Sequence, residues 1–160
     1  KERSENVMVV DLVRNDLSRV CEPGSVKVDE LFGLYSFPQV HQMISSVSGQ
    51  LAAGFHPVEA LRQSFPMGSM TGAPKIRVMQ LIEEYEQSRR GLFSGAIGYF
   101  RPGRVQHDFD FNVIIRSLFY HQSRQFASFQ VGGGITFNSI PEEEYEECLL
   151  KASAMLKVLQ

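Results

Sequence analysis

The sequence predicts a mixed α/β (α+β) domain, and three observations lead to this prediction. Helix-like patterns lie near both ends of the chain, in residues 1–20 and from Pro141 onward. Between them, residues 93–131 form three consecutive apolar stretches separated by turn residues, as in an antiparallel meander. The 160 residues are 43% apolar with a formal net charge of −2, which is typical of one globular domain with a substantial core.

Composition also excludes several classes of protein. A near-neutral charge gives no support for nucleic-acid binding, which favours a basic stripe. No apolar run approaches the roughly 18 residues of a membrane span, and no signal peptide is recognisable. Cys21 and Cys148 are isolated and lack metal-site spacing, which indicates a reducing cytoplasm.

The first 20 residues predict a helix. Met8, Leu12 and Leu17 form its apolar stripe, and four polar residues suit its wetter face: Arg14, Asn15, Asp16 and Arg19. Beyond a turn at Pro23–Gly24 come the next predicted segments: a short strand at Ser25–Val28, mostly loop at Asp29–Pro38, a strand at His41–Leu51 and a helix at Pro57–Ser64. The strand places Gln42, Ile44 and Ser46 on one face, and the neighbouring His41 could be structural or catalytic.

The stretch from Phe65 to Lys75 is rich in glycine and hydroxyl groups. Gly68 and Gly72 bracket Ser69 and Thr71, and Pro74 opens a helix that should run to about Gln87. A loop of this kind leading into a helix N-terminus suits an anion or a hydroxyl-rich ligand, although its spacing is not that of a Walker loop.

Three strands are predicted next, at residues 93–100, 109–119 and 125–131, with loops at Pro102–Gly103 and His121–Ser123. Arg116 follows the apolar run Val113–Ile115. If it is buried it needs a partner, and a ligand carboxylate is a natural bidentate one. On an edge strand, it would lie in solvent instead.

The stretch from Gln130 to Ala152 contains the highest density of candidate binding residues. Gly132, Gly133 and Gly134 expose backbone N–H groups and permit positive φ, so this loop could wrap an anion. Ser139–Glu142 fits a capping box with proline in the first turn of an acidic helix.

Two glutamate pairs share the same spacing. Glu144 and Glu147 lie on one helix face with Lys151 four residues further on, and Glu2 and Glu5 repeat the three-residue spacing near the start of the chain. Two such pairs could meet to hold a divalent cation, and oxygen-only ligands favour Mg²⁺ over zinc. The alternative is an ordinary acidic helix start with a surface ion pair.

Taken together, these motifs resemble the chorismate-utilising enzymes, which include anthranilate synthase component I, aminodeoxychorismate synthase component I and the isochorismate and salicylate synthases. The resemblance covers the whole chain in six ordered blocks: residues 5–17, 43–47, 68–75, 90–100, 115–117, and 130–134 together with 141–151. The family domain is larger, so residues 1–160 are expected to be the C-terminal part of a single chorismate-binding catalytic domain.

The resemblance implies a fold and a site. The fold is a sandwich of two mostly antiparallel sheets flanked by helices. Mg²⁺ would be held by Glu2, Glu5, Glu144 and Glu147, with Lys151 beside it. Arg116 and the backbone of Gly132–Gly134 would bind the enolpyruvyl carboxylate of chorismate, and the hydroxyl loop with Ser69 and Thr71 would lie near the ligand.

Three departures from the family pattern bear on the reaction. The family histidine falls on Gln42, an aromatic hydroxyl falls on Phe93, and the loop at Arg101–His107 is longer. Losing the imidazole weakens the case for a base that eliminates pyruvate. The pattern therefore favours 4-amino-4-deoxychorismate formation for para-aminobenzoate and folate synthesis, with Gln42 and Lys151 at catalytic positions.

Two alternatives stay open. Anthranilate synthase component I is one, and a non-catalytic chorismate-binding fragment is the other. In the favoured function, ammonia would come from a glutamine amidotransferase subunit. An upstream segment resembling Pro-Ile-Lys-Gly-Thr would support aminodeoxychorismate synthase, and alanine in place of its lysine would support anthranilate synthase.

Overall fold

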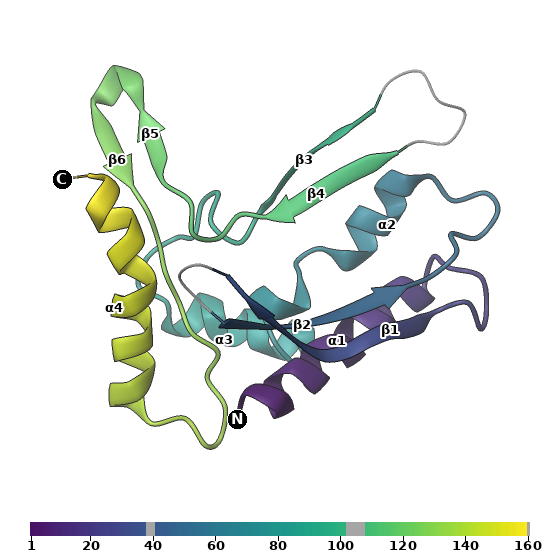
Figure 1. Cartoon of the computed structure of the whole chain (residues 1–160). Coiled ribbons are helices and arrows are strands. Elements are labelled where there is room, and N and C mark those ends of the chain that lie inside the picture. Colours follow the sequence, from purple (N-terminus) through teal and green to yellow (C-terminus); the bar gives the residue numbers. More distant parts are fainter. Residues whose placement is uncertain (38–40, 102–107, 160) are drawn as a thin grey trace. The chain divides into compact units, whose positions relative to one another are not determined.

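The computed structural model describes residues 1–37, 41–101 and 108–159 (Figure 1). The predicted Pro102–Gly103 loop and most of the Arg101–His107 insertion lie outside these residues. Two compact units are present: an N-terminal unit, Glu2–Gln87, and a C-terminal unit, which is Lys1 together with Ser88–Gln160. Both combine helices with short antiparallel sheets, so the predicted mixed α/β class is confirmed.

The N-terminal unit contains α1 (Glu2–Ser18), β1 (Lys27–Ser36), β2 (His41–Ser48), α2 (Pro57–Ser64), the 3₁₀ turn η1 (Gly68–Met70) and α3 (Lys75–Tyr85). The helix predicted for residues 1–20 and the one at Pro57–Ser64 are confirmed. In α2, Pro57 occupies the first turn and the His56 side chain accepts a hydrogen bond from the Val58 N–H. This cap explains why the helix starts there.

The loop predicted at Asp29–Pro38 is wrong for most of its length, because β1 extends through Ser36 and pairs with β2. Two irregularities in the pairing, between Val28 and Glu30 and between Glu30 and Gly33, interrupt the alternation of side chains. Phe32 lies between them with φ 61°. A bulged strand does not show the period-two pattern by which strands are recognised, so the sequence concealed it.

Helix α1 packs against the β1–β2 hairpin, as Figure 1 shows. A hydrogen bond of 2.6 Å from the Ser45 hydroxyl to Asn6 Oδ1 joins the helix to β2. The expectation that Asp16 lies on the wetter face of α1 is wrong, since Asp16 is 3% exposed. Its carboxylate is paired with Lys75, and this partner permits its burial.

The C-terminal unit contains β3 (Ala96–Phe100), β4 (Phe109–Val113), β5 (Phe119–His121), the 3₁₀ turn η2 (Gln122–Arg124), β6 (Phe126–Ser128) and α4 (Pro141–Val158). β3 pairs with β4 and β5 with β6, both antiparallel. The predicted continuous meander is wrong, because β4 and β5 are not paired in the described part of the chain. Strand 109–119 is interrupted around Arg116, which has φ 49°.

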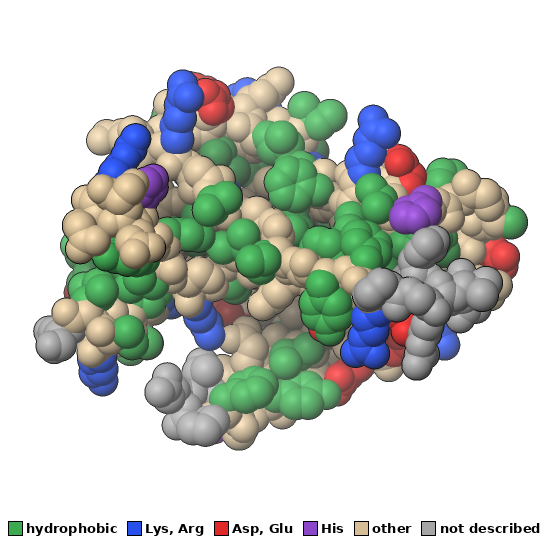
Figure 2. Space-filling model, turned by 90° about the horizontal axis from the view of Figure 1, so that it is seen from above, with side chains coloured by type: hydrophobic (Ala, Val, Ile, Leu, Met, Phe, Trp, Pro, Cys, Tyr) green, Lys and Arg blue, Asp and Glu red, His purple; other side chains and the backbone are tan. Residues whose placement is uncertain are grey.

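Many large apolar side chains remain exposed. The hydrophobic residues that are buried among those described form a short set: Val10, Val20, Cys21, Ile114, Ala152 and Met155. Leu34, Ile76 and Leu150 are each at least 74% exposed, and Figure 2 shows wide apolar areas open to solvent on one face. Contiguous exposed apolar surface is typical of faces that contact other parts of a protein. No described helix is both long and apolar enough to cross a membrane.

Candidate functional site

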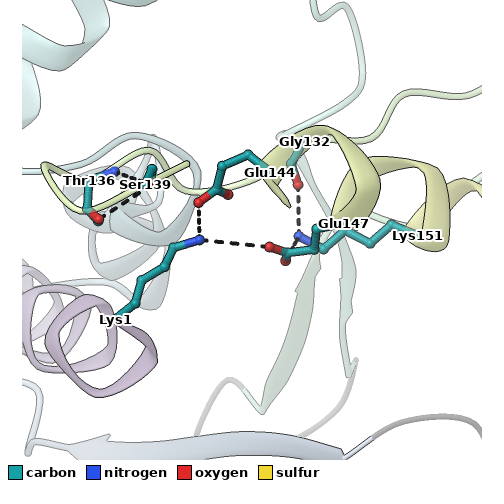
Figure 3. Close-up of polar contacts among 7 residues, drawn as sticks. All are labelled: Lys1, Gly132, Thr136, Ser139, Glu144, Glu147 and Lys151. Carbon is teal, nitrogen blue, oxygen red and sulfur yellow. Dashed lines mark hydrogen bonds and ion pairs between the residues drawn. The ribbon is translucent and has the colours of Figure 1, made fainter. Parts of the chain in front are cut away.

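The start of α4 positions the acidic residues of the candidate site. Pro141 lies in the first turn as predicted, but the capping box is wrong, because the helix cap is Ile140 and no side chain bonds to it. The Ser139 hydroxyl instead accepts the backbone N–H of Thr136 at 3.0 Å (Figure 3). Ser139 thus closes the turn before the helix and does not cap it.

Glu144 and Glu147 lie on one face of α4 and share a cation, the ammonium group of Lys1 (Figure 3). Lys1 Nζ donates a short hydrogen bond to Glu144 Oε1 and lies 4.0 Å from Glu147 Oε2. The ammonium, above all through this hydrogen bond, lowers the pKa of the Glu144 carboxyl. Both carboxylates are therefore arranged around a positive charge, as a cation site requires.

One oxygen of Glu144 is buried without a partner. The residue is 5% exposed, and its Oε2 accepts no hydrogen bond from the described part of the chain. A side-chain carbon added at Gly133 would lie 3.1 Å from this oxygen. The nearby Ser139 hydroxyl helps to lower the pKa of this carboxyl group. A buried carboxylate oxygen normally has a donor or a metal ion, so Oε2 is the acceptor of this pair that is open to a further partner.

The glycine loop allows a close approach at Gly133, and neither Gly132 nor Gly133 uses the left-handed backbone that glycine permits. The backbone at Gly133 lies against Glu144 because no side chain intervenes. Lys151 Nζ donates to Gly132 O at 3.0 Å and pairs with Glu147 at 2.6 Å. Lys151 therefore ties the loop, including the adjoining Gly134, to the face of α4 that carries the glutamates.

Arg116 lies in the bend that follows β4. Its side chain is exposed, and no described carboxylate forms an ion pair with it. Backbone bonds between Ser94 and Ile114 and between Ile114 and Gly95 extend the β3–β4 hairpin up to this bend. A left-handed backbone in a residue other than glycine is strained, and such residues concentrate at functional sites.

Glu2 and Glu5 occupy the first turn of α1, in the N-terminal unit, whereas Glu144 and Glu147 belong to the C-terminal unit. No group of three or more His, Cys, Asp or Glu side chains that could hold a metal occurs among the described residues. Each glutamate pair therefore lies within one unit. Assembly of all four carboxylates stays a prediction.

The hydroxyl loop lies in the N-terminal unit. Ser69 is exposed within η1, whereas the Thr71 hydroxyl donates to Met67 O at 3.0 Å. Thr71 thus helps to shape the loop, and Ser69 is the hydroxyl that the loop presents to solvent. Gly72 has φ 151°, which explains the glycine at this position.

Gln42 and His41 are neighbours near the start of β2. Pairing with β1 is regular from His41 to Ile44, without a bulge, so the two side chains point to opposite faces of the hairpin. Gln42 is exposed, and the His41 ring contacts the Ser36 hydroxyl at 2.9 Å. His41 therefore does not take the position of Gln42 in this structure.

Sequence reasoning missed two contacts. Lys1 lies 143 residues before Glu144, and Lys75 lies 59 residues after its partner Asp16. Neither separation has a local periodicity that a sequence pattern could reveal. The i,i+4 pair of Glu147 and Lys151, in contrast, was visible in the spacing.

Comparison with known proteins identifies the family of this chain. The family model for chorismate binding enzymes matches residues 1–157. The chain belongs to this family. Among curated chorismate binding enzymes, it is 45% identical to a probable chloroplastic aminodeoxychorismate synthase of Oryza sativa subsp. japonica over 100% of this chain and 17% of that protein.

Two bacterial members of the family are also similar. The chain is 43% identical to aminodeoxychorismate synthase component 1 of Bacillus subtilis, over 100% of this chain and 33% of that protein. The crystal structure of anthranilate synthase component I from Streptococcus pneumoniae superposes with a TM-score of 0.80 at 35% identity, covering 97% of this chain and 34% of that one. The chain thus spans about a third or less of the length of these relatives.

Proposed function

We propose that this protein aminates chorismate to 4-amino-4-deoxychorismate. The glutamate pair on α4, which faces a cation beside the glycine loop, is the observation that carries the proposal. The identity of 43–45% to aminodeoxychorismate synthases over the whole chain supports this reaction within the family. Ammonia would be supplied by a glutamine amidotransferase partner, and the printed name "component 1" of the bacterial relative is consistent with a second component.

The residues present on α4 fit a magnesium ion. Glu144 has one buried oxygen without a partner, and the Lys1 ammonium already lies between the two carboxylates. Carboxylate oxygens are the ligands that Mg²⁺ prefers. Glu144 and Glu147 would hold the ion together with Glu2 and Glu5. When bound, it would supply positive charge to the ring carboxylate as negative charge develops there.

Side chains and backbone groups of this chain would bind and orient the substrate. Arg116 would bind the enolpyruvyl carboxylate in a bidentate contact, with help from backbone N–H groups of the glycine loop. Lys151 would keep that loop against Glu147 through its two contacts. The ring hydroxyl leaves as water, ammonia adds to the conjugated ring, and the enolpyruvyl ether is retained.

The product depends on position 42. A glutamine side chain is neutral across the working pH range and cannot serve as a general base. His41 points to the other face of the hairpin, where its ring contacts Ser36. Among the described residues, neither His41 nor Gln42 therefore places an imidazole on the face of the hairpin that carries position 42. This supports an enzyme that stops at the aminated product.

We predict that the complete protein, given chorismate, ammonia and Mg²⁺, accumulates aminodeoxychorismate and releases little pyruvate. A placed base typically contributes roughly 10²–10⁴-fold to such an elimination. Coupling the reaction to lactate dehydrogenase measures the pyruvate, and chromatography measures the loss of chorismate. Pyruvate released in step with chorismate loss would contradict the proposal and identify an anthranilate synthase, which the Streptococcus pneumoniae structure keeps as the second candidate.

We also predict that the 160-residue chain alone does not turn over chorismate. It exposes apolar faces on β1, α3 and α4, and it spans about a third of its bacterial relatives. Part of the site's surroundings would therefore be missing. Steady product formation by the purified chain, followed by chromatography with the complete protein as the positive control, would refute this.

Cytoplasmic localisation likewise stays a prediction, since the plant relative is named as chloroplastic.

A further inference from the structure

A largely enclosed ion pair joins α1 to the first residue of α3. Lys75 Nζ lies 2.6 Å from Asp16 Oδ2, and the two side chains are 18% and 4% exposed. Removing both charges from water is costly, so an enclosed pair is weak evidence for stability. The presence of an enclosed ion pair is better explained by a role in fixing one specific arrangement of two segments.

The same helix makes a second contact with the segment that precedes Lys75. A side-chain carbon added at Gly68 would lie 2.9 Å from Leu12 Cβ, so the backbone at Gly68 packs directly on Leu12. Leu12 and Asp16 are four residues apart and share one face of α1. The helix therefore contacts both ends of the loop from Gly68 to Lys75, which carries Ser69 and Thr71.

This face of α1 also includes Glu5. Leu12 and Asp16 follow Glu5 by 7 and 11 residues, which at 3.6 residues per turn puts each of them within about 20° of Glu5 around the axis, on opposite sides of it. Along the axis, they lie roughly 10 and 16 Å beyond Glu5. One helix thus sets the separation between a carboxylate expected to bind metal and a loop expected to bind substrate.

We propose that Asp16 and Lys75 are positioning residues, whose ion pair holds the Gly68–Lys75 loop at a fixed place on α1 and thereby sets the position of Ser69 relative to Glu5. The inference rests on the proposed function, which assigns Glu5 to the metal, and on the family resemblance, which implies that Ser69 lies near the ligand. Neither member of the pair contacts the substrate in this account. Both act through the loop.

The test uses four variants of the complete protein. Asp16→Asn and Lys75→Met each remove one charge, and the double variant D16N/K75M removes both, so that no buried charge is left alone. Asp16→Glu keeps the negative charge on a longer side chain. Asp11→Asn is the matched control, because Asp11 pairs with Arg14 at 3.0 Å on the same helix, with both side chains more than half exposed.

We expect the double variant to unfold at a higher temperature than either single variant, because it has no unpaired buried charge. Its KM for chorismate should nevertheless stay raised by about 10–100-fold, as a misplaced binding loop predicts. Its magnesium activation constant should stay near that of the wild type. Asp16→Glu should show a smaller rise in KM, and Asp11→Asn should stay within about twofold of wild type.

Hydrogen–deuterium exchange gives a second readout that does not need activity. The Met70 amide donates to Met67 O, just before the loop, at 2.9 Å, and the Thr71 amide donates to Gly68 O at 3.3 Å. They should exchange faster in the double variant than in the wild type or in Asp11→Asn. A folded double variant with either a wild-type KM or wild-type exchange would overturn the inference.

The two readouts separate this inference from the proposed function. A wild-type protein that does not turn over chorismate would refute the function, while the exchange measurement would still decide whether the ion pair orders the loop. Wild-type exchange in the double variant refutes the positioning role even if the enzyme is active.

Discussion

Replacing Glu147 with alanine should abolish chorismate turnover and leave the fold intact. The Glu147 side chain is 41% exposed, so its removal leaves little empty space, whereas its carboxylate is one of the two around the shared cation. Loss of an outer-sphere partner of a metal typically costs roughly 10–100-fold in affinity or activity, and loss of a direct ligand should cost more. Initial rates with saturating chorismate and Mg²⁺, alongside thermal unfolding, measure both effects.

The control is Glu146→Ala, which removes an exposed carboxylate from the same helix. It should retain wild-type activity. Glu144→Ala should be as inactive as Glu147→Ala, because it removes the buried oxygen that lacks a partner. Wild-type rates for Glu147→Ala, or full activity of the unmodified enzyme in the presence of a chelator, would contradict the magnesium site.

Replacing Arg116 with alanine should raise the KM for chorismate strongly. A bidentate, charged hydrogen bond that becomes enclosed around a ligand contributes roughly 1.5–3 kcal/mol, which corresponds to about 10–150-fold. The guanidinium is exposed in this structure and available to a ligand carboxylate. Steady-state kinetics over a range of chorismate concentrations measure the change.

Two further variants separate the guanidinium from the backbone. Arg116→Gly accepts the left-handed φ of 49° without strain, so it tests whether the side chain or the conformation matters. It should lose as much affinity as Arg116→Ala. Arg124→Ala, which removes another exposed arginine of the same unit, should leave KM unchanged. An unchanged KM in Arg116→Ala would mean that Arg116 is a solvated residue without a role in binding.

The parts of the fold that could be predicted are those governed by local periodicity. The N-terminal helix, the helix at Pro57–Ser64 and the proline in the first turn of α4 were all predicted. β1 was not, because its bulged pairing around Phe32 removes the alternation. The strand predicted at residues 109–119 was too long, because β4 ends at Val113. The next residues, Ile114 and Ile115, are apolar and β-branched, but they lead into the left-handed Arg116.

In the candidate site, too, the features set by local spacing could be predicted from the sequence and the others could not. Spacing on one helix correctly put Glu144, Glu147 and Lys151 on a common face. The capping box failed because the Ser139 hydroxyl can bond to the preceding turn as well as to the helix, and the sequence does not decide between them. The contacts from Lys1 to Glu144 and from Asp16 to Lys75 depend on tertiary structure alone.

The regular pairing of β2 has an evolutionary consequence. Because His41 and Gln42 point to opposite faces, the residue at position 42 can change without altering the contact between His41 and Ser36. Glutamine and histidine codons differ by a single base. Under the proposed function, one point mutation would therefore offer this scaffold a titratable base, and selection could act on the choice between two metabolic products without first having to rebuild the strand.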